Sequence, residues 1–135
     1  MATTTICDAN LWSEFALPAA ASTAVYSAKL KLTEGKDPAG IIDYPGDLVV
    51  IIPALTATIV PDGKTVTVSV ETSNDDFTTT ESTTLATLAG SSGVAKQTLR
   101  YKFPRTPVQQ ARVKVEFGAN CTDGSALKAL AVWEF

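Results

Sequence analysis

The chain has 135 residues, of which 45% are hydrophobic and 19% charged, and its net charge is −3 with a pI near 4.8. This length and apolar content predict one globular domain with its own core. The acidic balance and the lack of a dense basic run argue against a nucleic-acid-binding protein, whose affinity depends largely on phosphate contacts. The sequence holds no histidine, which excludes Ser-His-Asp and Cys-His catalysis and removes the commonest metal ligand.

Targeting signals are not evident in the sequence. Residues 1–6 lack the charged and apolar regions of a secretory signal. The longest apolar run, at 48–55, is too short to span a bilayer. We therefore expect a protein that is made in a cytoplasm and has no membrane contact. Cys7 and Cys121 are expected to be reduced thiols there, although pairing of the first and last strands could bring them together.

The first 24 residues predict an N-terminal arm or an edge strand, which precedes the domain proper at 25–135. The segment is rich in threonine at first and in small residues after Pro18. Between these parts lie four apolar residues: Leu11, Trp12, Phe15 and Leu17. Either they form the first strand of the domain, or they belong to an extended segment that packs on something else.

The next predicted strand is 24–32, with one face turned inward and two lysines outward. Its inward residues are expected to be Tyr26, Ala28, Leu30 and Leu32. Loops follow at 34–40 and 44–47, where Pro and Gly cluster. The run 48–53 departs from alternation, which predicts a strand covered on both faces, either wholly internal or part of an interface.

Strict alternation at 65–71 predicts a half-buried strand with Val66, Val68 and Val70 on its buried face. Further strands are predicted at about 96–103, 111–118 and 126–134, separated by turn signals. These make roughly seven or eight short strands with no long helix. The fold class is therefore all-β, an antiparallel β-sandwich or jelly roll with an extended N-terminal arm.

Candidate chemistry is sparse, and no cofactor is expected. The compact acidic cluster 74–76 could hold calcium, but Asn and Asp are typical turn residues and a turn is favoured. Nothing in the sequence brings two loop carboxylates to the fixed separation that a glycosidase needs; the candidates are Glu14, Glu34, Asp37, Asp43 and Asp47. Of the aromatic residues, Tyr26 and Tyr101 are expected in the core, while Trp12 and Tyr44 are kept as surface candidates.

Five segments form a pattern of strands and turns in the order 46–52, 66–77, 102–104, 111–117 and 125–131. This order resembles the capsid cement (decoration) proteins of some short-tailed bacteriophages, over most of the sequence from residue 43 onward. The resemblance implies an oligomeric jelly roll on the outside of an icosahedral head, where it bridges neighbouring major capsid subunits. It also implies a virion protein without catalytic residues or a cofactor.

On this hypothesis the apolar arm clamps a capsid subunit or a sister copy, and the strand at 48–52 contributes to the oligomer contact. The expected contact residues are Leu11, Trp12, Phe15, Leu17, Tyr44, Val49 and Ile51. The expected partners are the major capsid protein and further copies of the same protein, with a dimer favoured and a trimer possible. The alternatives are a carbohydrate-binding jelly-roll module and a phage tail or fibre domain.

Overall fold

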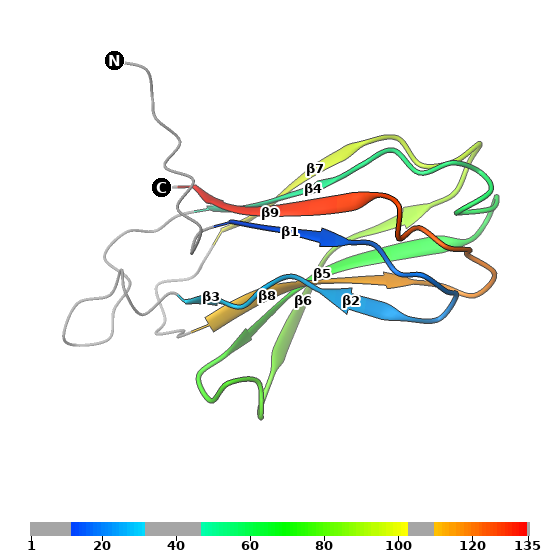
Figure 1. Cartoon of the computed structure of the whole chain (residues 1–135). Helices are drawn as coiled ribbons and strands as arrows, with labels where there is room; N and C mark the ends of the chain where they lie inside the picture. The colour runs from blue at the N-terminus through cyan, green and yellow to red at the C-terminus, as the bar shows by residue number, and fades with distance from the viewer. Residues whose placement is uncertain (1–11, 32–46, 103–109, 135) are drawn as a thin grey trace, which may run out of the picture.

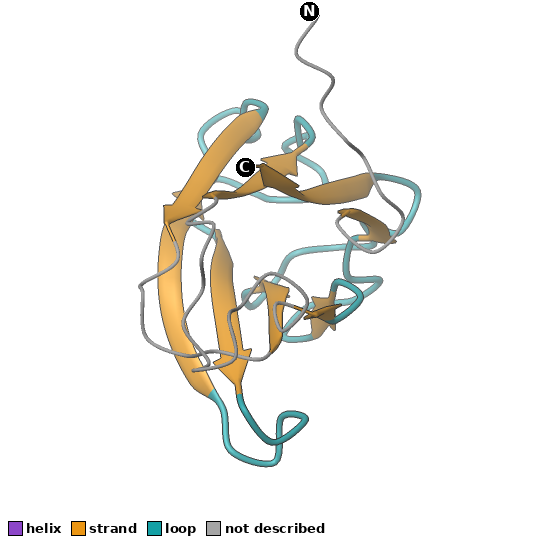
Figure 2. Ribbon diagram, turned by 90° about the vertical axis from the view of Figure 1, so that its left-hand side faces the viewer, coloured by secondary structure: helices purple, strands orange, loops and turns teal. Residues whose placement is uncertain are grey.

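The computed structural model of the protein describes residues 12–31, 47–102 and 110–134. Within these ranges the polypeptide forms nine strands and no helix. Figure 2 shows strands joined by loops, arranged in two layers. The predicted all-β sandwich class is therefore confirmed. Among the described residues no helix is long and apolar enough to cross a membrane.

Each layer is one antiparallel sheet (Figure 1). Sheet A has the order β1 (Trp12–Ala16), β9 (Lys128–Glu134), β4 (Asp47–Ile52), β7 (Gln97–Lys102). Sheet B has the order β2 (Ala24–Tyr26), β8 (Gln110–Phe117), β5 (Thr65–Ser73), β6 (Glu81–Ala89), and β3 (Leu30–Lys31) also pairs with β8. Strands near the two termini pair with each other, β1 with β9 and β2 with β8, and the inner strands pair as β4 with β7 and β5 with β6. The pairing is thus nested, as in one long hairpin folded over itself.

The core lies between the sheets and is built by the alternation seen in the sequence. Val66, Val68 and Val70 of β5 are fully buried, and the neighbouring strand β8 buries Val113 and Phe117 beside them. Burying a side chain of this size contributes about 1.5–3 kcal/mol. The predicted buried face of 65–71 is therefore confirmed.

Strand β4 is apolar on both faces, as its sequence predicted. Leu48, Val50 and Ile52 belong to the core, whereas Val49 points to the outer face of sheet A. Val49 is nonetheless only 4% exposed, and Ile51 on the same outer face is partly buried. The unbroken β-branched run thus reflects low exposure on both sides of the strand.

The predicted strand 24–32 is wrong, because it breaks at Ser27 into β2 and β3. The hydroxyl oxygen of Ser27 accepts the N–H of Val113 at 2.9 Å, and the N–H of Ser27 donates to the carbonyl of Val113 at 2.9 Å. The next amide, that of Ala28, donates to Ser13 Oγ in sheet A at 3.0 Å. The side chain of Ser27 thus bonds to an amide of β8 while the backbone turns away.

This break corrects the two inward assignments that can be checked there. Tyr26 lies on the outer face of sheet B and is 42% exposed, and Ala28 is exposed as well. In β2 it is Val25 that packs against the core. Leu32 lies outside the described residues, and the side chain of Leu30 is not described. The other tyrosine predicted to be inward, Tyr101, does pack against the core.

Candidate binding surfaces

The predicted contact residues fall into three groups. Leu11 and Tyr44 lie outside the described residues, and Trp12 is described only through its backbone, which pairs with Val132. Phe15 and Leu17 follow the inward phase of β1, set by pairing of Phe15 with the core residue Ala129. Val49 and Ile51 share the outer face of sheet A.

Leu17 cannot be part of a clamp on another protein in this structure. Its side chain is 1% exposed and sits in the core of its own domain, and Phe15 is partly buried against that core. The prediction of a contact at Leu17 is therefore corrected. Phe15 and Leu17 serve the fold, because the edge strand β1 covers the end of its own sandwich.

The outer face of sheet A carries an apolar stripe, formed by β4 and β9. Val49 pairs with Val132, and Ile51 pairs with Leu130 in the next row. Val132 is 8% exposed, while Ile51 and Leu130 are partly exposed. These four residues, together with the charged residues that flank them, are called the sheet A face below.

Charged pairs lie at both ends of the stripe. Lys128 Nζ lies 3.6 Å from Glu14 Oε1, and Arg100 Nη1 lies 3.7 Å from Asp47 Oδ2. Exposed pairs of this kind contribute only about 0–1 kcal/mol to stability. An apolar centre within a polar rim is the anatomy of a protein–protein interface. Glu14 and Asp47 each have a basic partner, and the other glycosidase candidates, Glu34, Asp37 and Asp43, lie outside the described residues.

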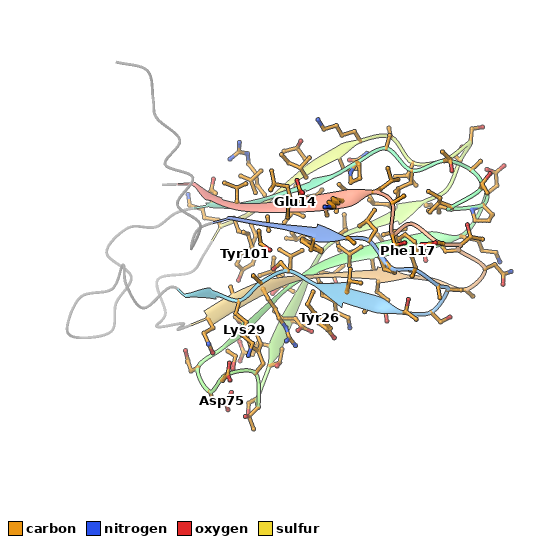
Figure 3. All side chains as sticks on the ribbon, viewed as in Figure 1. Glu14, Tyr26, Lys29, Asp75, Tyr101 and Phe117 are labelled. Atoms are coloured by element: carbon orange, nitrogen blue, oxygen red, sulfur yellow. The ribbon has the colours of Figure 1, made fainter. Side chains whose placement is uncertain are left out.

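The outer face of sheet B carries a different surface, centred on Arg112 of β8. Its guanidinium carbon lies 4.1 Å from the ring centres of both Tyr26 and Phe77. Its Nε donates to Glu71 Oε1 at 2.8 Å, and the side chain of Glu71 is only 10% exposed. Figure 3 labels Tyr26 and Lys29 on the side of sheet B that faces away from sheet A. We call Tyr26, Glu71, Phe77 and Arg112 the Arg112 stack.

The turn between β5 and β6 places Phe77 in the stack. Ser73 Oγ accepts the N–H of Asp75 at 3.1 Å and that of Phe77 at 2.9 Å. Asp76 and Phe77 both adopt left-handed backbone conformations, with φ of 55° and 63°. Such a conformation is uncommon for a bulky residue and is favoured only when surrounding contacts over-determine it. Here those contacts are the Ser73 hydroxyl and the guanidinium above the ring.

The acidic residues of this turn are engaged within it. The backbone N–H of Thr79 and the hydroxyl of Ser73 hold the pKa of Asp75 below its ordinary value. Hydrogen bonds from Lys29 and then Gln110 lower the pKa of Asp76. No group of three metal-ligating side chains occurs among the described residues. The acidic cluster 74–76 is therefore a turn, the interpretation that the sequence favoured.

Sequence reasoning did not find the Arg112 stack. The alternation of β8 indicates that Arg112 points outward, but its partners come from a strand break at Ser27 and from a left-handed turn at Phe77. Comparisons with protein-family models, curated proteins and solved structures found no match for this protein.

Proposed function

We propose that this protein is a non-catalytic component of a bacteriophage particle, a capsid cement protein that binds the outside of an icosahedral head. In this role it bridges neighbouring major capsid subunits and is made in the cytoplasm of the host. The sheet A face is the observation that carries the proposal, because it offers an apolar centre and a charged rim on a rigid sheet. The resemblance of the sequence to decoration proteins supports the same assignment.

The strand pairing supports a jelly roll as the finer fold class. Two sheets of nested strand pairs, β1 with β9 and β4 with β7 against β2 with β8 and β5 with β6, are what a wound double hairpin produces. Such a domain holds its outer faces rigid, since both sheets share one core. A rigid face loses little conformational entropy when it docks.

Cement function would be mechanical and cumulative. Each copy buries a modest area across a boundary between capsid subunits, and many copies act on one shell. Ligands that bind only the assembled state stabilise it by mass action. Homo-oligomers, with a dimer favoured, would link two such contacts and raise the effective concentration of the second one.

The test is co-sedimentation of the purified protein with phage heads that have been stripped of it. We expect saturable binding at a fixed copy ratio, with higher resistance of the heads to heat and osmotic shock. Ile51→Lys places a charge in the apolar centre and should lower head affinity by about tenfold or more, because burying an unpaired charge is costly. Thr87→Lys, the same charge change on exposed strand β6 of sheet B, is the matched control.

If Ile51→Lys binds heads as tightly as the wild-type protein, the assignment of the sheet A face is refuted. No binding to heads at all would refute the cement function. The alternative, a carbohydrate-binding module, needs a row of exposed aromatic rings; among the residues whose side chains are described, Tyr26 is the one exposed large hydrophobic residue. A panel of soluble glycans in the same assay tests that alternative directly.

A further inference from the structure

We propose that the Arg112 stack is a binding site for a carboxylate group of a partner protein. The site lies on sheet B, away from the sheet A face, and does not depend on the cement function. The carboxylate would dock on the outer edge of the Arg112 guanidinium, beside the half-exposed ring of Tyr26.

Within the described part of the chain, most hydrogen-bond donors of the guanidinium have no partner. An arginine carries five N–H donors, and in Arg112 only the Nε hydrogen bonds to another described residue, Glu71. The two terminal amino groups form the edge farthest from the backbone, and the side chain is 21% exposed. In the proposed complex these two amino groups donate two parallel hydrogen bonds to the carboxylate, the arrangement that a guanidinium and a carboxylate commonly form.

The stack holds this edge in place before any partner arrives. The ring centres of Tyr26 and Phe77, each 4.1 Å from the guanidinium carbon, restrict the guanidinium plane, and the hydrogen bond to Glu71 restricts its rotation. A free arginine side chain loses up to about 2 kcal/mol of rotamer entropy on binding, and Arg112 has already lost most of it. The left-handed Asp76 and Phe77 fit this view, since backbone strain is often retained at binding sites.

The surrounding charges favour a single carboxylate over a polyanion. Glu71, within the stack, already accepts a hydrogen bond from Arg112, and the neighbouring Asp76 accepts hydrogen bonds from Lys29 and Gln110. Lys114, which pairs with Tyr26 in the sheet, adds one further donor. Around the stack, the described side chains of both signs are interspersed: Lys29, Arg112 and Lys114 lie among Glu71, Asp76 and Glu116. Such a face selects its ligand by hydrogen bonds and not by bulk charge.

A protein is the source of the carboxylate that this surface fits best. Tyrosine and arginine are the residues that most often carry binding energy at protein interfaces, and here they stack on each other. The ring of Tyr26 offers apolar contact next to the docking edge. An aspartate or glutamate side chain, or the terminal carboxylate of a polypeptide, would supply the same group.

The experiment is an NMR titration that follows the side-chain Nε–Hε signal of Arg112 in the full-length protein. One probe is a blocked tripeptide with a central glutamate, and its matched partner carries glutamine instead. A third probe is a tripeptide with a free C-terminus and no acidic side chain. We expect saturable shifts with the glutamate probe, the free C-terminus or both, and none with the glutamine probe.

Variants separate the site from general charge effects. Arg112→Lys keeps the positive charge but loses the planar fork, and should weaken binding of the glutamate probe by about tenfold or more. Tyr26→Ala should weaken it several-fold, whereas Tyr26→Phe, which keeps the stacked ring, should not. Lys96→Gln, an exposed lysine ahead of β7, serves as the control and should leave the affinity unchanged. Amide spectra confirm that each variant is folded.

Equal shifts with the glutamine and glutamate probes would overturn the proposal, as would unchanged affinity in a folded Arg112→Lys variant. Tighter binding of N-acetylneuraminic acid than of any peptide would also overturn it, because the site would then belong to an acidic glycan. None of these outcomes depends on phage heads, so failure here is distinguishable from failure of the cement function.

Discussion

Ser27→Ala tests the hydrogen bond that divides the predicted strand 24–32. The hydroxyl of Ser27 accepts the N–H of Val113 at 2.9 Å, and Val113 is fully buried in the middle of sheet B. Alanine removes the acceptor and leaves that amide without a partner in a place that water reaches poorly. We expect the variant to fold but to be clearly less stable.

The magnitude follows from the burial of the orphaned group. A buried donor that loses its partner costs about 1–3 kcal/mol. The variant also loses the hydrogen bond that Ser27 Oγ donates to the Ala28 carbonyl at 3.0 Å. We therefore expect the free energy of unfolding to fall by about 2 kcal/mol. For a domain of this size that corresponds to a melting temperature lower by about 6 °C.

Equilibrium urea unfolding followed by tryptophan fluorescence measures this difference. The midpoint should fall while the m-value stays unchanged, because the surface exposed on unfolding is the same. Ser125→Ala is the matched control, since its hydroxyl donates to Asp123 in an exposed turn and its loss should change stability by less than about 0.5 kcal/mol. A Ser27→Ala variant as stable as the control would refute the role of this bond in the sheet.

Three further predictions concern the core, a loop and the β5–β6 turn. Phe117→Ala should cost about 3–5 kcal/mol in urea unfolding, because Phe117 is fully buried and its removal leaves a cavity; a loss under about 1 kcal/mol would contradict this packing. Gly93→Ala should lower the free energy of unfolding more than Gly63→Ala. Both glycines have positive φ, but only at Gly93, of the two, would the new Cβ lie 2.4 Å from a backbone oxygen. Equal losses of stability in the two variants would contradict that close approach. The pKa of Asp75 is lower in the folded protein than its ordinary value of 3.8. The ionised carboxylate therefore stabilises the turn fully above pH 3.8, and this stabilisation is lost as the pH falls through the pKa of the folded state. Protection factors of the turn amides, which correct exchange for its intrinsic pH dependence, should therefore fall only below about pH 4, and Asp75→Asn should remove that fall.

The sheets were predictable where one side-chain period runs through a whole strand. Val66 to Val70 and Val113 to Phe117 alternate without interruption, so one face had to be buried. The run through Val49 was equally informative, because an unbroken apolar strand needs low exposure on both faces. In these segments the alternation identifies the face that packs on the core, but it does not give the exposure of the other face: Glu71 is in the outward phase of β5 and is nonetheless buried beside Arg112.

The candidate surfaces were less predictable, for a physical reason. Tyr26 and Leu30 were expected on one face, but the pairing with β8 shifts by one residue between β2 and β3, where the Ser27 side chain replaces a backbone acceptor. Tyr26 therefore lies opposite outward Lys114, whereas Leu30 lies opposite buried Ala111. Leu17 lies in a segment that also suits an external arm, and only the position of β1 at the edge of sheet A turns it inward. The Arg112 stack depends on residues far apart in the sequence, so no local pattern contains it.

The two surfaces face away from each other across a single core. Sheets in a sandwich pack about 10 Å apart, and here the space between them is filled by close-packed valines, leucines and Phe117. A packed interior transmits little between its two outer faces unless it has a second arrangement to adopt. A ligand on the Arg112 stack should therefore leave the intrinsic affinity of the sheet A face unchanged. Any bridging by this protein would then arise from geometry, with two independent contacts held at a fixed separation, so its strength would depend on where the partners place their own sites.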